Sequence, residues 1–274
     1  YSFRYRTLKN IEGVPLDWAN NAAKKYDDNL FGTQQNMEGL GLNSLSFTEH
    51  NLTYARTIFD RSTSFLKAGI SVKILNGTDA SYFQVRSGQY KFIDSISPPV
   101  ELTTIDATLG SSKNNDQLFY KHRGLGFDLG VTYEYRPDFE NQYYEMDGVK
   151  RNVRYDINKY KWKVSASFTD LGFVRFMSDS AAYYDFTNTL ATANANKLVN
   201  VTSLNLTSLF QSPFEYVKDS LASTGTTVPG EKLAKFRMNL PAAFHANFDM
   251  NVYKSFFYVS YNASVPLHFK KGMK

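Results

Sequence analysis

The most constraining feature of the sequence is a strict two-residue alternation through GLGFDLGVTYEYR, residues 124–136. Apolar side chains occupy one set of alternate positions, and small or charged side chains occupy most of the other set. A period of two is that of a β-strand, because successive side chains of a strand point to opposite faces of a sheet. Ordinary strands have about five or six residues. The segment therefore predicts an unusually long strand with two different faces.

Other segments repeat this pattern and extend the β prediction over most of the chain. Clear alternation occurs at residues 66–74, 159–169, 242–251 and 257–265. Weaker alternation occurs at residues 1–8, 47–58, 80–86 and 172–177. Strands with one apolar and one polar face are typical of antiparallel sheets. We therefore expect an all-β, antiparallel fold.

The connections between the predicted strands have two different lengths. Tight turns are predicted at residues 59–64, 170–172 and 251–255. Long connections are predicted at residues 9–45, 87–116 and 178–234. In a transmembrane barrel, short turns gather on the periplasmic side and long loops on the other. We expect the three tight turns to share one end of the fold.

Two of the long connections carry helix signals. Pro15 at a first-turn position, apolar residues at four-residue spacing and Gly32 as a stop signal predict a helix of about four turns. Ser212, Pro213 and Glu215 form a capping box with proline at the first helical position. We expect two short amphipathic helices that pack on the surface of the domain, and docking to a membrane or a partner is the alternative.

The length of the alternation favours a membrane barrel over a soluble sheet. A tilted membrane strand needs about 9 to 11 residues. Four of the predicted strands hold their alternation over nine or more residues. A soluble sandwich or barrel remains the alternative, because it shows the same period. We therefore predict an antiparallel transmembrane β-barrel with two short amphipathic helices in long connections.

The alternation assigns side chains to the two faces of this barrel. The predicted lipid-facing residues are Leu125, Phe127, Leu129, Val131, Tyr133, Tyr135, Tyr160, Trp162, Val164 and Phe168. The predicted lumen-facing residues are Gly126, Asp128, Gly130, Glu134, Arg136, Lys161 and Lys163. Aromatic residues near strand ends are typical of the girdle where the bilayer meets water.

Composition and motifs give no indication of an enzyme or of a bound cofactor. The chain has no cysteine, which excludes thiolate catalysis and cysteine-based metal sites. Its four histidines are far apart in the sequence, and none has the spacing of a metal motif. Lysine and arginine are dispersed and the net charge is only +5, so we expect no nucleic-acid partner. We expect no catalytic residues, no metal and no cofactor.

Four segments also carry a resemblance to a known family. They read FLKAGISVKILNG (65–77), GLGFDLGVTYEYRP (124–137), NKYKWKVSASFTDLG (158–172) and NLPAAFHANFDMNV (239–252). In order and spacing they resemble an uncharacterised family of outer-membrane barrels from Bacteroidetes-type bacteria, described as a domain of unknown function. The resemblance implies a single outer-membrane barrel domain over residues 1–274, and some relatives continue into an OmpA-like peptidoglycan-binding domain. The chain begins directly in a strand and stops at KKGMK, so the expectation is an incomplete barrel.

Three functions are compatible with these features. The first, which we favour, is a non-enzymatic structural or accessory subunit of a cell-envelope complex in the bacterial outer membrane. Its partners would be membrane lipid and other outer-membrane or periplasmic proteins. The second is a channel or transporter for small solutes, and the third is a soluble β-rich binding protein. A filled interior distinguishes the first from the second.

Overall fold

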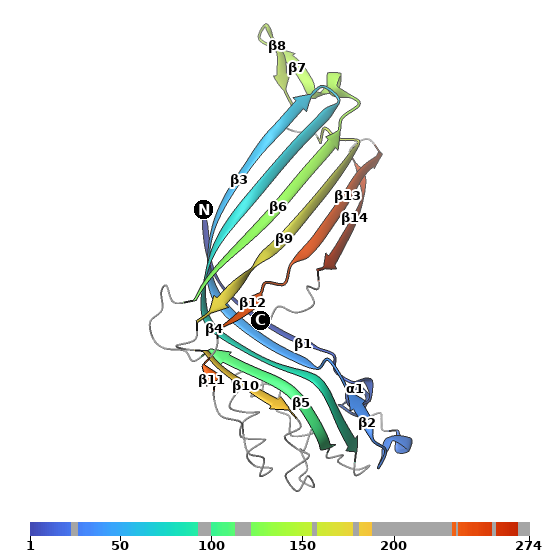
Figure 1. The fold of residues 1–274 in the computed structure, drawn as a ribbon. Coiled ribbons are helices and arrows are strands. Elements are labelled where there is room, and N and C mark those ends of the chain that lie inside the picture. Colours follow the sequence, from blue (N-terminus) through green and yellow to red (C-terminus); the bar gives the residue numbers. More distant parts are fainter. Residues whose placement is uncertain are drawn as a thin grey trace.

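The computed structural model is almost entirely β. It describes residues 1–22, 27–92, 100–112, 122–154, 158–177, 181–187, 232–233, 235–253 and 256–267. A 12-stranded antiparallel sheet forms the body, and a two-stranded hairpin stands apart from it. The large sheet curls into a half-barrel (Figure 1). The expected all-β, antiparallel and incompletely closed barrel is therefore confirmed.

The elements follow one another along the chain with few helices among them. The bounds are β1 Ser2–Glu12, α1 Leu16–Ala22, η1 Asp28–Leu30, β2 Gln35–Met37, β3 Gly41–Arg61, β4 Ser64–Phe92, β5 Val100–Ser112, β6 Arg123–Tyr135, η2 Phe139–Gln142, β7 Tyr143–Met146, β8 Val149–Val153, β9 Trp162–Phe176, β10 Ala181–Thr187, β11 Lys232–Leu233, β12 Phe236–Asn239, β13 Ala243–Tyr253 and β14 Phe257–Pro266. Within the described residues, no helix has the length and apolar character needed to cross a membrane.

The half-barrel has a continuous order of seven strands, β1-β3-β4-β6-β9-β13-β14. Its register aligns the alternating faces of neighbouring strands. Leu129 of β6 lies opposite Ile70 of β4 and Phe168 of β9. On the other face, Thr132 lies opposite Ser165. The periods predicted for residues 66–74, 124–136 and 159–169 therefore combine into one apolar convex face and one mainly polar concave face.

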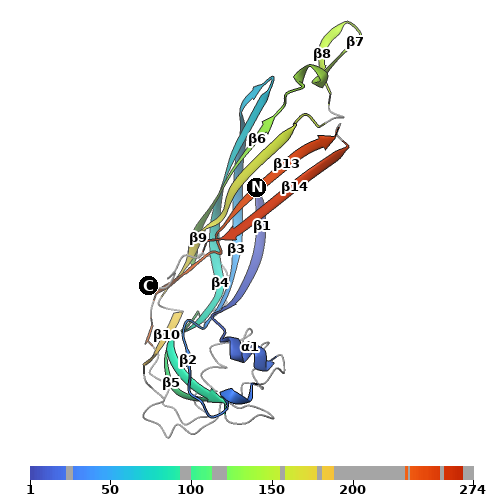
Figure 2. The ribbon, with the colours of Figure 1, turned by 90° about the vertical axis from the view of Figure 1, so that its right-hand side faces the viewer.

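Strand β4 is long enough to belong to two parts of the sheet. Its first half pairs with β6, and its second half pairs with β5, beyond which β10 and β11 continue the sheet. The change coincides with a bulge at Thr78, because Ser46 pairs with Asp79 whereas Phe47 pairs with Gly77. The strands bend at this level, so that a second lobe extends away from the half-barrel (Figure 2).

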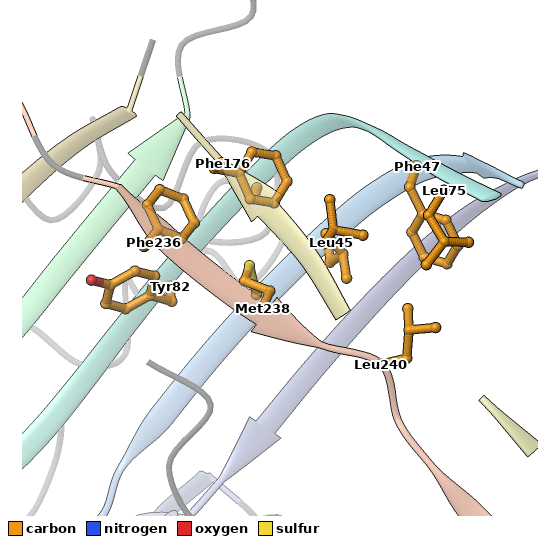
Figure 3. Close-up of a cluster of buried hydrophobic side chains, with 10 residues drawn as sticks. Leu45, Phe47, Leu75, Tyr82, Phe176, Phe236, Met238 and Leu240 are labelled. Atoms are coloured by element: carbon orange, nitrogen blue, oxygen red, sulfur yellow. The ribbon is translucent and has the colours of Figure 1, made fainter. Parts of the chain in front are cut away.

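A cluster of buried hydrophobic side chains fills the concave side near this bend (Figure 3). Its members are Leu45, Phe47, Leu75, Ala80, Tyr82, Val174, Phe176, Phe236, Met238 and Leu240. Strand β12 runs along β9 and supplies Phe236 and Met238, and Leu240 follows directly after it. Gly77 lies against the cluster, where an added Cβ would come within 2.8 Å of both Val174 Cγ1 and Phe176 Cζ. The close packing of the cluster therefore requires glycine at this position.

Helix α1 packs on the far half of β4 through aromatic and polar contacts. The Trp18 ring lies edge-on to the Tyr90 ring, with centroids 5.3 Å apart. The Tyr90 hydroxyl donates a hydrogen bond to the Asp17 carboxylate. Burial, together with this hydrogen bond, raises the pKa of Tyr90 well above its usual value. The contact thus joins the first described helix to the second lobe.

The structure corrects several predicted boundaries. Residues 170–172 form no turn, because β9 continues through them as one strand. The predicted strands at 66–74 and 80–86 are parts of the single strand β4. The first predicted helix corresponds to α1, which is shorter than the expected four turns. The second predicted helix, around Ser212, lies outside the described residues. The tight turns near 59–64 and 251–255 do share one end, which is the end where β7 and β8 stand (Figure 1).

Candidate functional site: the concave face of the half-barrel

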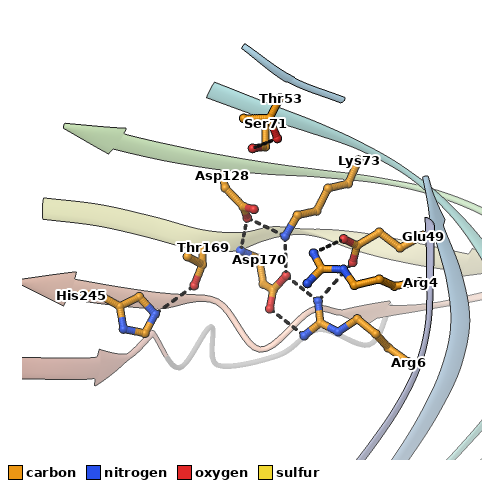
Figure 4. A network of polar contacts seen from close by, with 10 residues as sticks. All are labelled: Arg4, Arg6, Glu49, Thr53, Ser71, Lys73, Asp128, Thr169, Asp170 and His245. Atoms are coloured by element: carbon orange, nitrogen blue, oxygen red, sulfur yellow. Dashed lines mark hydrogen bonds and ion pairs between the residues drawn. The ribbon is translucent and has the colours of Figure 1, made fainter. Parts of the chain in front are cut away.

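Six charged side chains form a connected network on the concave face (Figure 4). They are Arg4, Arg6, Glu49, Lys73, Asp128 and Asp170. Three positive charges thus face three negative charges. The Glu49 side chain is 0% exposed and that of Lys73 is 3% exposed. Charges buried to this extent are tolerated only when they are paired and hydrogen-bonded.

Asp170 is the central acceptor of the network. Two nitrogens of Arg6 donate to its two carboxylate oxygens, each at 2.8 Å. Lys73 Nζ lies 2.8 Å from Asp170 Oδ1 and 2.6 Å from Asp128 Oδ1. Arg6 also donates to Glu49 at 3.2 Å, and Arg4 donates to Glu49 at 2.6 Å. The bidentate Arg6–Asp170 pair is the geometry that gives the strongest charge-assisted hydrogen bonds.

A β-bulge in β9 positions the Asp170 carboxylate. The register of β6 against β9 shifts between Phe127 and Leu129, and Asp170 has a φ of +56°. Aspartate tolerates this left-handed conformation better than most residues. The Asp170 backbone N–H donates to Asp128 Oδ1 at 2.8 Å. The sequence pattern Asp-Leu-Gly at 170–172, which predicted a turn, therefore marks a bulge.

The Arg6–Asp170 pair joins strands that are not neighbours. Arg6 lies on β1 and Asp170 on β9, and β3, β4 and β6 separate them in the sheet. Four steps of about 4.8 Å place these strands roughly 19 Å apart along the sheet. The two side chains nevertheless meet at 2.8 Å across the concave side. The network therefore links the two sides of the curl and stabilises its curvature.

A second charged group lies toward the end with the tight turns. Arg136 Nη2 lies 2.6 Å from Glu134, and Lys163 Nζ lies 2.8 Å from Asp249. The Arg136 guanidinium also lies over the Phe65 ring, 4.2 Å from its centroid. The structure thus brings together Glu134 and Arg136, two of the predicted lumen-facing residues, and places Lys163 opposite Glu134 in the register.

The other predicted lumen-facing positions lie along the same strands or just before them. Gly126 is opposite Lys73, and Gly130 is opposite Ser167. Lys161 precedes β9, and its backbone N–H donates to the Tyr135 carbonyl at 2.7 Å. None of these three residues contributes a side-chain contact to the charged network of Figure 4.

The predicted lipid-facing residues lie mostly on the convex face. The exposed residues include Leu125, Phe127, Leu129, Val131, Tyr135, Val164 and Phe168. The Trp162 ring packs against the rings of Tyr133 and Tyr135, with centroids 5.4 and 5.6 Å away. Tyr160 differs, because it precedes β9 and its ring lies 4.8 Å from Lys163 Nζ on the concave side. Strict alternation therefore begins at Trp162.

Apart from the hydrophobic cluster, the described part of the concave face presents ionic and hydrogen-bonding groups. No group of histidine, aspartate and glutamate side chains among the described residues has the arrangement needed to hold a metal ion. Sequence reasoning missed Arg4, Arg6, Glu49, Lys73 and Asp170 as members of one network. Alternation within residues 1–8 marks Arg4 and Arg6 as sharing a face, but no local signal indicates their partners.

Comparison with known protein families places the chain in a family without an assigned function. The model of a family of unknown function, DUF5723, matches residues 1–269. No curated protein and no solved structure matches the chain. The resemblance to an uncharacterised family is thereby confirmed, whereas the bacterial group and the additional peptidoglycan-binding domain stay predictions.

Proposed function

The chain belongs to the DUF5723 family, whose function is unknown, and we propose from its geometry that it is a non-enzymatic structural or accessory subunit of a bacterial outer-membrane assembly. The proposal places a single barrel domain in the outer membrane, in contact with lipid and with other outer-membrane or periplasmic proteins. It includes no catalytic residue, cofactor or nucleic-acid partner.

The dimensions of the convex apolar face support a membrane location. On β6 the exposed apolar positions run from Leu125 to Tyr135. Ten steps of about 3.4 Å give roughly 34 Å along the strand, or about 26 Å across the bilayer at a usual tilt near 40°. Outer-membrane barrels have an apolar band about 25 Å tall. The aromatic contacts of Tyr133 and Tyr135 with Trp162 lie at the end of this band, as in an interfacial girdle.

The observation that carries the subunit proposal is the filled concave side. The hydrophobic cluster of Figure 3 occupies one level, and the ionic network of Figure 4 occupies the next. Phe47 and Phe176 are 0% exposed, and the Lys73 and Asp170 side chains are nearly buried. A minimal pore needs a continuous wet path, and close-packed rings beside paired charges leave little room for one.

The test combines purification with conductance. We expect the protein to require detergent, to copurify from mild detergent with stoichiometric partners, and to give little conductance in planar bilayers. A double variant, Phe47→Ala with Phe176→Ala, should conduct more than the wild type if it still assembles, because it removes two rings from the filling. If the wild-type protein is a lone monomer and conducts small solutes steadily, the channel function replaces this proposal.

The polar pairs of the concave face are the observation in favour of the channel alternative. Thr132 and Ser165 share a hydrogen bond of 3.1 Å there, and Thr53 and Ser71 share one of 2.8 Å. Behaviour as a monodisperse protein without detergent would instead favour the soluble binding protein. The same purification experiment therefore separates all three functions.

A further inference from the structure

A small pocket lies on the concave face beside the ionic network, and its lining suggests a ligand. It is formed by β9, β13 and β14 and has a volume of about 200 Å³. Its polar lining residues are Ser165, Ser167, His245, Asn247, Asn262 and Ser264, and we call this site the polar pocket. A liquid water molecule occupies about 30 Å³, so the volume corresponds to roughly six or seven waters. That is about the space taken by one sugar ring.

The sheet register builds the polar pocket from facing rows of side chains. Ser167 lies opposite His245, and His245 lies opposite Ser264 in the next strand. In the adjoining row, Asn247 lies opposite both Ser165 and Asn262. The rows come from alternate positions of three neighbouring strands, so their side chains project from one face. The pairing of the three strands therefore sets the arrangement of the six groups.

The lining offers both donors and acceptors of hydrogen bonds. Asn247 donates a side-chain N–H to the side-chain oxygen of Asn262. The Asn247 oxygen can therefore still accept a hydrogen bond, and the side-chain N–H groups of Asn262 can still donate. His245 Nε2 shares a hydrogen bond of 3.0 Å with the Thr169 hydroxyl, so Nδ1 is the ring nitrogen that can bond a ligand. Each serine hydroxyl can donate and accept. A ligand group that also does both, such as a hydroxyl, matches this lining.

The lining also contains no carboxylate, lysine or arginine. The neighbouring charged side chains are already paired, with Lys163 bound to Asp249 and Lys73 bound to Asp170. A charged ligand would lose its hydration without gaining an opposite charge in the polar pocket, and such desolvation is costly. A neutral ligand avoids this cost.

We propose that the polar pocket binds a neutral, hydroxyl-rich molecule of the size of one sugar unit. This goes beyond the proposed subunit function and does not depend on it, because the site would bind whether or not the protein conducts or has partners. The hydrophobic cluster and the ionic network lie farther along the concave face, so binding in the polar pocket does not require a path through the protein.

Glucose and glucuronate are matched probes, because they differ mainly by a carboxylate. Binding should be measured by saturation-transfer NMR and calorimetry in a detergent without a sugar headgroup, since glucoside and maltoside headgroups would compete. We expect glucose to bind and glucuronate to bind at least tenfold more weakly. Failure of glucose to bind the folded wild-type protein, or equal binding of both probes, would overturn the proposal.

Substitutions locate the binding to the polar pocket. Asn247→Leu should weaken glucose binding at least tenfold, whereas Ser71→Ala, on the same face but outside the pocket, should leave it unchanged. If Asn247→Leu fails to fold, Ser264→Leu on the neighbouring strand provides the same test. Unchanged binding in a folded pocket variant would refute the assignment. Conductance and copurification are measured separately, so a failure here is distinguishable from a failure of the subunit proposal.

Discussion

The ionic network makes Asp170→Asn the most informative substitution. Asparagine keeps the shape of the side chain and tolerates the φ of +56°, so the change removes charge with little effect on the backbone. It leaves Arg6 without its bidentate partner and leaves the network with one excess positive charge. Breaking a buried ion pair costs about 3–5 kcal/mol.

The cost at this site should lie below that range. Arg6 is 23% exposed and keeps its hydrogen bond to Glu49, and Lys73 keeps its contact with Asp128 at 2.6 Å. We therefore expect Asp170→Asn to lower the free energy of unfolding by about 2–3 kcal/mol, a hydrogen bond to a charged group being worth about 1.5–3 kcal/mol. Urea unfolding of the folded protein in bilayers, followed by tryptophan fluorescence, measures the change.

A double-mutant cycle with Arg6→Met tests the cause. If the pair carries the effect, Asp170→Asn should cost much less in the Arg6→Met background, with a coupling of about 1–3 kcal/mol. Additive single effects, or a loss below about 0.5 kcal/mol for Asp170→Asn, the range of an ordinary surface substitution, would refute the reasoning. Asp170→Gly is a useful control, because it relieves the backbone but also removes the carboxylate.

Three further perturbations test other parts of the fold. Leu129→Arg should cost about 2–4 kcal/mol if its face meets the bilayer midplane, whereas Thr132→Arg should be milder; folding yield into vesicles compares them. Gly77→Ala should destabilise by about 1–3 kcal/mol through overpacking, while Gly130→Ala, whose Cβ would lie 3.6 Å from its nearest neighbour, should be tolerated in the same unfolding assay. Raising the pH above about 10 should destabilise the wild type, because the unfolded chain loses the Tyr90 proton first; Tyr90→Phe should flatten this part of a pH–stability curve.

Much of the half-barrel could be predicted from the sequence because alternation is a local property. The faces of residues 124–136 and 162–168 follow from single segments, and pairing preserves them in the sheet. The length of β4 could not be predicted in this way. Its bulge at Thr78 moves the concave positions from odd residues such as Leu75 to even ones such as Tyr82, so the alternation in the sequence is interrupted there.

The concave site was harder to predict because its contacts connect distant parts of the chain. Arg6 and Asp170 are 164 residues apart in the sequence, and only the curl of the sheet makes them neighbours. Alternation shows that Arg6 shares a face with Arg4, but it contains no information about curvature. The hydrophobic cluster was missed for the same reason, because β12 reaches its place beside β9 through a long connection.

Strand direction limits what can close the half-barrel. Every pairing from β1 through β3, β4, β6, β9 and β13 to β14 is antiparallel, so the outer strands β1 and β14 point the same way. A direct seam between them would be parallel, and so would a seam to an identical copy with the same orientation in a membrane. A wholly antiparallel barrel that includes these seven strands therefore contains an odd number of additional strands between β14 and β1.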